Sequence, residues 1–322
     1  MNPLSRRAVI VGLSALAASS GRASAQYQTL KIIYPYSAGG SGDAVARMIA
    51  EHLQKSLGRP VIVDNRVGAG GRIAARAVKD APANGSELLF AAAAQVTLQP
   101  HIYRDLGYDP FVDFVPISQT IKSDLALAVS NQVPARSIKE LIAWFKANPA
   151  QALYGSPGAG TAAHFAGTEL ARSSGLELRH IAYRGTSAAL PDILAGRIPL
   201  YIAQVAELIE QHKNGALRIL ATAETVRSAL LPDIPTLHES GVDIDAPGWF
   251  GFYAPAHTPK DILDRLEKAI ISATQASDVR TKILTIGFQP TGTTGAELDK
   301  IQRAQFEHWG PIVKASGFKA DD

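Results

Sequence analysis

The sequence predicts an α/β fold made of two units in tandem, and three observations support this prediction. Strand-like and helix-like patterns alternate from residue 30 onward. The alternation restarts after Asp124, so the chain holds two such units. In both units a glycine-rich turn separates a strand from the helix that follows it, as is typical of open α/β sheets. We therefore expect two lobes, each with helices packed on a sheet.

The first unit has the order strand, helix, strand, helix, strand. Apolar and β-branched runs predict strands at 30–34, 61–63 and 88–92. Apolar residues at helical spacing predict helices at 43–57 and 73–78. This order predicts a parallel sheet with helices on its faces.

The second unit repeats this rhythm. Ser137 and Glu140 form a capping box in front of its first helix. The expected strands are 125–129, 153–154, 179–182, 200–203 and 219–222, and the expected helices are 138–146, 161–172 and 187–194.

The C-terminal quarter is mainly helical. Residues 249–254 form a last apolar strand, and Thr258 with Pro259 predicts a helix start with a cap and a proline at the first helical position. A capping box at 294–297 starts another helix, which continues through Ile312. Helices without a strand of their own should pack onto an existing sheet.

The chain should therefore cross between the lobes twice. We expect the first crossing near Asp124 and the return near Trp249. Residues 26–124 together with 249–322 should form lobe 1, and residues 125–248 should form lobe 2.

Residues 1–25 have the composition of an export signal peptide. Arg6 and Arg7 precede a short apolar run at 8–18, and the small residues 23–25 form a cleavage site. The run is too short for a membrane-spanning helix, which needs about 20 residues. The paired arginines favour the twin-arginine route, and general secretion is the alternative. Either route leads to the periplasm.

Charge and cysteine content exclude several classes of function. Three of the 32 Lys and Arg residues lie in the expected signal peptide, which leaves 29 basic and 29 acidic residues in the mature chain. The mature chain is thus formally neutral and has no basic run, so we expect no nucleic-acid partner. The absence of cysteine excludes disulfides, thiolate metal sites and a cysteine nucleophile.

Two glycine-rich turns are candidate anion sites. The first covers residues 36–43 and the second covers residues 155–161, each between a strand and a helix. Glycines let the backbone approach a ligand, and the free N–H groups of a helix start favour a carboxylate or phosphate. Tight turns without a ligand are the alternative. Asp43 stands where a helix N-cap is expected. His164 could donate to the anion or could simply be packed.

Motifs for chemistry are weak or absent. Residues 158–163 match the dinucleotide pattern G-x-G-x-x-A, with Glu177 at a tolerable distance, whereas the cluster at 68–71 lacks its third small residue. No G-x-S-x-G elbow occurs, because Tyr154 stands where the first glycine is needed. The eight histidines show no metal-binding spacing. We expect no catalytic residues, no metal and no cofactor.

Six ordered motifs resemble the Bug-type receptors, the extracytoplasmic solute-binding proteins of tripartite tricarboxylate transporters. The motifs lie at 34–43, 63–71, 108–114, 183–186, 232–236 and 249–255. The resemblance implies the type II periplasmic-binding-protein fold, in which two α/β lobes joined by two crossing strands close on a ligand. It also implies that backbone N–H groups, hydroxyls and water from the glycine-rich loops hold the ligand carboxylates.

The resemblance carries over to particular residues of this chain. The predicted contacts of the first lobe are Tyr36, Ser37, Ala38, Gly39, Gly40 and Asp43, and those of the second lobe are Ala159, Gly160, Thr161 and His164. Tyr183, Arg184, Gly185 and Thr186 should form the opposing rim.

Two positions depart from the family pattern. Gln95 stands where relatives often carry small hydroxyl residues, and Gln204 stands where many carry acidic or serine-bearing sequence. Both are candidates for shaping the specificity of the pocket.

These observations predict a periplasmic, monomeric receptor that captures a small organic carboxylate and delivers it to a tripartite tricarboxylate-type membrane transporter. Three alternatives stay open at this point. The protein could report to a sensor kinase, bind a dinucleotide, or be an exported hydrolase with Ser156 or His164 in its cleft.

Overall fold

A computed structural model describes residues 28–320, and the expected signal peptide at 1–25 lies outside these described residues. Within them the strands are β1 (Leu30–Tyr34), β2 (Val61–Asn65), β3 (Glu87–Ala92), β4 (Phe114–Ser123), β5 (Leu125–Ser130), β6 (Leu153–Ser156), β7 (Arg179–Ala182), β8 (Leu200–Gln204), β9 (Leu217–Thr222), β10 (Gly248–Pro255) and β11 (Gln289–Pro290). The helices are α2 (Ser41–Leu57), α3 (Arg72–Lys79), α4 (Gln99–Ile102), α5 (Ile138–Ala147), α6 (Ala162–Ser174), α7 (Thr186–Leu194), α8 (Val205–Lys213), α9 (Lys260–Gln275), α10 (Ser277–Thr285) and α11 (Gly295–Ser316). Short helical turns lie at Ala69–Gly71, Ala94–Leu98 and Pro149–Gln151.

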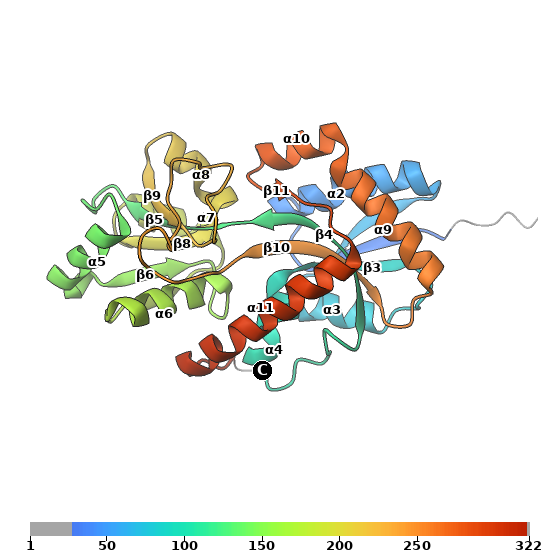
Figure 1. Cartoon of the computed structure of the whole chain (residues 1–322), viewed down its shortest axis with the longest axis horizontal. Coiled ribbons are helices and arrows are strands. Elements are labelled where there is room, and N and C mark those ends of the chain that lie inside the picture. The colour runs from blue at the N-terminus through green and yellow to red at the C-terminus, as the bar shows by residue number, and fades with distance from the viewer. Residues whose placement is uncertain (1–27, 321–322) are drawn as a thin grey trace, which may run out of the picture.

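The strands form two sheets, one in each lobe (Figure 1). The first sheet has the order β11-β4-β10-β3-β1-β2, and β1 pairs in parallel with β2 and β3. The second sheet has the order β7-β6-β8-β5-β9, and β6 pairs in parallel with β7 and β8. The predicted parallel cores are therefore present, while β4, β5 and β10 run antiparallel to their neighbours.

Helices cover both faces of the first sheet because its strands are apolar on both sides. Ile32 of β1 packs in a cluster with residues of α2, α9 and α10, whereas the adjacent Ile33 packs in a cluster with residues of α3 and α11. Alternate side chains of a strand point to opposite faces, so one strand can serve both clusters. The prediction that strandless C-terminal helices pack onto an existing sheet holds for α9 and for the start of α11, while α10, which packs beside α9, was not predicted.

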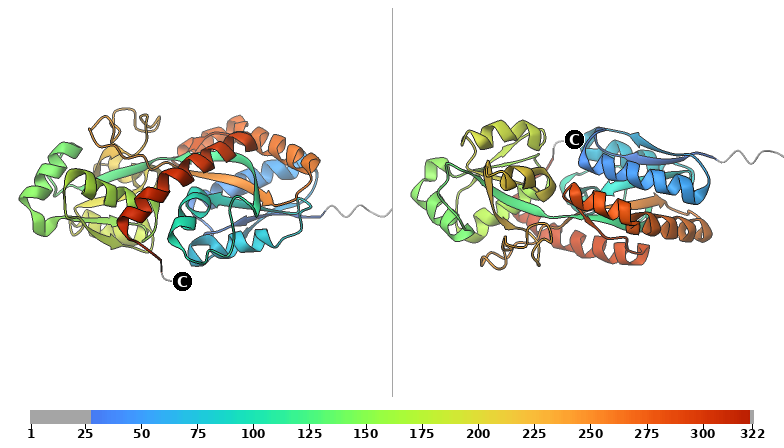
Figure 2. Two further views of the ribbon diagram at one scale, coloured as in Figure 1. Left: turned by 60° about the horizontal axis from the view of Figure 1, so that its bottom comes forward. Right: turned by 90° about the horizontal axis from the view of Figure 1, so that it is seen from above.

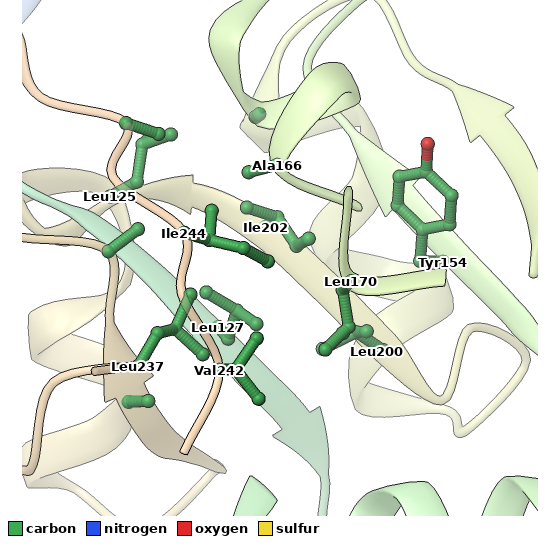
Figure 3. Packing of buried hydrophobic residues seen from close by; sticks show 14 of the residues in the cluster. Leu125, Leu127, Tyr154, Ala166, Leu170, Leu200, Ile202, Leu237, Val242 and Ile244 are labelled. Carbon is green, nitrogen blue, oxygen red and sulfur yellow. The ribbon is translucent and has the colours of Figure 1, made fainter. Parts of the chain in front are cut away.

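Helices also cover both faces of the second sheet, so the loops that lead into these helices lie on opposite faces. Leu200 and Ile202 of β8 pack with α6 (Figure 3), whereas Tyr201 and Ala203 pack with α7 and α8 on the other face. The segment that carries Leu237, Val242 and Ile244 covers the α6 side of this sheet as well (Figure 3). Helix α6 and helix α8 therefore begin on opposite faces of the sheet.

Two neighbouring stretches of chain connect the lobes (Figure 1). Strand β4 runs directly into β5 at Asp124, and the chain returns through residues 223–247 into β10. Strands β4 and β10 pair antiparallel over most of their length. The sequence analysis did not identify β4 as a strand, although it placed the crossing at Asp124.

Helix α11 reaches from the first lobe to the second (Figure 2). Leu298, near its start, packs in a core cluster of the first lobe, while Trp309 and Val313 pack in the core of the second. The lobe boundaries at 124, 125, 248 and 249 stay a prediction, and the contacts of α11 cross them.

Two predicted helix starts are wrong. Gly40, and not Asp43, is the N-cap of α2, which begins two residues earlier than expected. Pro259 is itself the N-cap of α9, and the Thr258 hydroxyl donates to the Pro255 carbonyl oxygen and so does not cap the helix. The capping box at Thr294 and Glu297 is confirmed at the start of α11.

Candidate functional site

A cavity of about 810 Å³ lies between the lobes, and both lobes contribute to its wall. The first lobe supplies Tyr34, Tyr36, Ser37, Ala38, Gly40, Ser41, Gly42, Val67, Ala92, Ala93, Ala94, Thr97, Leu98, Gly248, Trp249, Phe250 and Phe288, and helix α11, which spans both lobes, supplies Trp309. The second lobe supplies Leu125, Pro157, Thr161, Ala162, Ala163, Arg184, Gly185, Thr186, Ser187, Leu190, Gln204, Glu207 and Pro247.

Nine of the sixteen residues predicted for the contacts and the rim line this cavity. They are Tyr36, Ser37, Ala38, Gly40, Thr161, Arg184, Gly185, Thr186 and Gln204. The other seven lie close by in sequence or in space but are not part of its wall: Gly39, Asp43, Gln95, Ala159, Gly160, His164 and Tyr183. Contact of any of these residues with a ligand stays a prediction.

The first loop presents the start of α2 to the cavity. Gly40 has an extended backbone and makes no side-chain cap, so the N–H groups of the first turn have no partner within the helix. Ser41 and Gly42 of this turn line the cavity. Because free N–H groups and the helix dipole both favour negative charge, this wall suits a carboxylate.

Asp43 is buried, is not part of the cavity wall and supports the loop. Its carboxylate accepts hydrogen bonds from the Gly39 N–H at 3.0 Å, from Arg47 at 2.8 Å and from Asn65 at 2.9 Å. Burial alone would raise the pKa of Asp43, but these hydrogen bonds hold it below its usual value. Its acceptor sites are thus used within the first lobe, which makes Asp43 a positioning residue.

Gln95 is also a positioning residue and is fully buried. Its side-chain oxygen accepts from the Ala92 N–H at 2.7 Å, and its amide donates to the Tyr36 hydroxyl at 2.9 Å and to the Gly70 carbonyl at 3.2 Å. Gln95 therefore ties three segments together and acts on the cavity through Tyr36.

The second loop presents the start of α6. Thr161 is its N-cap, because the hydroxyl accepts from the His164 N–H at 3.2 Å and donates to the Gly158 carbonyl at 2.8 Å. Sequence reasoning placed this hydroxyl on a ligand, but its proton is already donated within the loop. Ala162 and Ala163, in the first turn, line the cavity and offer backbone N–H groups instead.

His164 and His180 form a stacked pair behind this loop, with ring centroids 4.1 Å apart. His164 Nδ1 accepts from the Gly160 N–H at 3.1 Å, and His180 Nε2 lies 2.8 Å from the Ser156 hydroxyl. Burial and the neighbouring His164 lower the pKa of His180 to about 4. Ser156 is fully buried and does not line the cavity, so the Ser–His pair cannot meet a cleft-bound ester there.

The opposing rim is only partly as predicted. Arg184 is exposed and lines the cavity, and within residues 28–320 its guanidinium has no hydrogen-bonding or ion-pairing partner. Tyr183 instead donates its hydroxyl to Asp192 at 2.7 Å, on the surface of the second lobe. Gln204 lines the cavity as the N-cap of α8.

Sequence reasoning missed Glu207, the one carboxylate among the described residues that line the cavity. It lies in the first turn of α8, a helix that was not predicted. A glutamate in the first turn is typical of a helix start, but Gln204 in front of it is not a usual N-cap residue, so the sequence signal for this helix is weak.

Residues 28–320 contain neither a metal-binding cluster nor a membrane-spanning helix. No group of three or more His, Asp or Glu side chains there is placed to hold a metal ion. None of the helices in that part of the chain combines the length and apolar character that a bilayer crossing requires.

Thr161→Ala should lower the free energy of unfolding by about 1 kcal/mol, the usual cost of losing a threonine N-cap. Thr161→Ser keeps the hydroxyl and should stay close to the wild type. Urea unfolding of the three unliganded proteins measures this difference. Equal stability of the alanine and serine variants would show that the cap contributes nothing.

The chain matches known proteins over most of its length. Residues 45–318 match the family model of the tripartite tricarboxylate transporter family receptor, TctC. Protein BugT of Bordetella pertussis is 30% identical over 292 residues, which cover 90% of each chain. The solved periplasmic binding protein BugD is 29% identical with a TM-score of 0.79, over 91% of this chain and 99% of that one. A protein of R. palustris solved with adipate is 27% identical with a TM-score of 0.81, over 90% of this chain and 98% of that one.

These likenesses confirm the predicted fold, the type II periplasmic-binding-protein fold with two α/β lobes joined by two crossing strands. They also decide against the hydrolase alternative, because the matched family consists of solute receptors and not enzymes. The chain belongs to the TctC, or Bug-type, family of tripartite tricarboxylate transporter receptors.

Proposed function

We propose that the mature protein works in the periplasm as a monomer that captures a small organic carboxylate between its lobes and delivers it to a tripartite tricarboxylate-type membrane transporter. Export by the twin-arginine route, after which residues 1–25 are removed, is part of this proposal. Relatives support the ligand class, since one R. palustris protein was solved with adipate and another with malate.

One observation carries the proposal. Helices α2 and α6, one from each lobe, both begin at the wall of the same cavity, with the N–H groups of Ser41 and Gly42 on one side and of Ala162 and Ala163 on the other. An anion held by both helix starts would contact both lobes at once.

Ligand binding should therefore be coupled to closure of the lobes. A carboxylate that contacts both lobes interacts more strongly with the closed form than with the open form, and this difference shifts the population toward closure. The two connections, at Asp124 and at residues 223–247, are the natural hinge.

A thermal-unfolding screen against mono-, di- and tricarboxylates tests the proposal. A ligand at about 100 times its dissociation constant should stabilise the protein by about 2.7 kcal/mol. The protein is unfolded and refolded first to remove any ligand kept through purification. No response to any carboxylate, together with a clear response to sugars, would overturn the ligand class.

A further inference from the structure

Glu207 is exposed at the cavity wall and is held there by a hydrogen-bond relay that begins at buried side chains of the second lobe. The hydroxyl of Tyr201, which is fully buried, donates to the Thr186 hydroxyl at 3.1 Å, and Thr186 donates to Oε2 of Glu207 at 2.6 Å. Since each hydroxyl has one proton, this order leaves Glu207 as the acceptor at the end of the relay. The carboxylate is thus oriented before any ligand arrives.

In the described part of the chain, the wall of the cavity carries one positive and one negative side chain, which differ in how firmly they are held. Among the described residues of its wall, Arg184 and Glu207 are the two that carry a full charge. Within residues 28–320 no ion pair joins Arg184 to Glu207, so the carboxylate of Glu207 has a hydroxyl donor but no cationic partner. Both side chains are exposed at the wall, but Glu207 is already oriented by the Thr186 hydroxyl, whereas Arg184 would lose side-chain freedom on pairing with a second anionic group of a ligand.

Glu207 also lies apart from the start of α6. Helix α6 packs on the Leu200 and Ile202 face of the second sheet, while α8, which carries Glu207, packs on the Tyr201 and Ala203 face. The second lobe therefore offers backbone donors from one face of its sheet and a carboxylate acceptor from the other. These two chemistries suit opposite ends of one ligand.

Building on the proposed carboxylate-receptor function, we propose that the preferred ligand is a zwitterion, with a carboxylate held by the helix starts of α2 and α6 and an ammonium group held by Glu207. An ammonium group supplies the positive charge and the N–H donors that the carboxylate lacks. A plain dicarboxylate would bring a second negative charge toward Glu207, and like charges at a cavity wall discriminate against such a ligand.

Desolvation raises the pKa of Glu207 above its usual value, although hydrogen bonds from the Thr186 hydroxyl and the Gln204 backbone oppose the rise. A bound ammonium group would oppose the effect of desolvation and favour the ionised carboxylate. A protonated Glu207 could instead donate to a ligand carboxylate, so a preference for dicarboxylates is the outcome that contradicts the proposal.

Calorimetric titration with matched ligand pairs tests the proposal. The straight-chain amino acids from β-alanine to ε-aminocaproate are each compared with the dicarboxylate of the same number of carbons, from malonate to adipate. In the wild type, at least one amino acid should bind at least tenfold more tightly than its paired dicarboxylate. The length at which this occurs gives the distance between the two ends of the site.

Glu207→Gln removes the charge but keeps an oxygen that can accept from Thr186. It should weaken binding of that amino acid at least tenfold and strengthen binding of its paired dicarboxylate. Glu210→Gln, on the exposed side of the same helix and outside the cavity wall, is the matched control and should change neither affinity. Unfolding curves of both variants check that the fold is kept.

The outcomes separate this inference from the proposed function. Tighter binding of every dicarboxylate by the wild type, or an unchanged affinity ratio in Glu207→Gln, would overturn the zwitterion but leave the carboxylate receptor intact. If no member of either series binds while sugars do, the receptor proposal and this inference both fail.

Discussion

Glu224→Gln should make the protein more stable at pH 8, and by much less at pH 5. Glu224 lies just after β9, where the chain leaves the second sheet toward the return crossing, and only 6% of it is exposed. One of its carboxylate oxygens has no hydrogen-bond partner among the described residues. A carboxyl group in such a place is stable only when it is protonated.

Burial, first of all, raises the pKa of Glu224 to about 8, and the nearby carboxylates of Asp124 and Asp245 add to the rise while Lys122 opposes it. The unfolded chain loses this proton near the ordinary glutamate pKa, so the folded state binds more protons between that pH and pH 8. Stability should fall as the pH rises through this window. At neutral pH the cost is on the order of 3 kcal/mol, and glutamine, which has no charge, avoids it.

Thermal or urea unfolding of both proteins from pH 5 to pH 8 measures this difference. The difference in the free energy of unfolding between Glu224→Gln and the wild type should increase steadily with pH. Glu210→Gln, an exposed carboxylate on α8, is the control and should run parallel to the wild type. If the free energy of unfolding of Glu224→Gln also follows that of the wild type at every pH, Glu224 ionises in the folded protein without loss of stability.

The alternating framework of the fold could be predicted because it depends on local patterns. Strand β7 was placed at its observed bounds, and the capping box of Thr294 was identified from its two residues alone. Strand β4 was missed because residues 118–123 are mostly polar and do not show the alternation of apolar and polar residues that predicts a strand. It is a strand because β10 and β11 pair with it, which is information from distant sequence.

The site could be predicted at the level of loops but less well at the level of side chains. A glycine-rich turn at the end of a strand indicates where the backbone is free, and both predicted loops do reach the cavity. Whether a side chain such as Asp43 faces the cavity depends on Arg47 and Asn65, which compete for it in three dimensions. Glu207 was missed because nothing near it in sequence shows that α8 begins opposite the first lobe.

Gly40→Val should abolish carboxylate binding, with a loss of at least a hundredfold, while the protein stays folded. The backbone of Gly40 (φ −77°, ψ 166°) is one that any residue adopts, and a Cβ there would meet nothing closer than the Ser37 carbonyl oxygen at 3.9 Å. The valine methyl groups would instead occupy the open space beside the first turn of α2 and keep a carboxylate from its N–H groups.

Gly40→Ala is the graded control, since its single methyl group should weaken binding less than valine does. Calorimetric titration with the best carboxylate of the screen measures both variants, and unfolding curves should show only the small stability loss that an unfavourable N-cap residue causes. Because the N–H donors of α2 remain in place in both variants, a loss that grows with side-chain size can come only from the space next to them. Wild-type affinity in a folded Gly40→Val protein would remove the first loop from the binding site and leave the second lobe alone to hold the ligand.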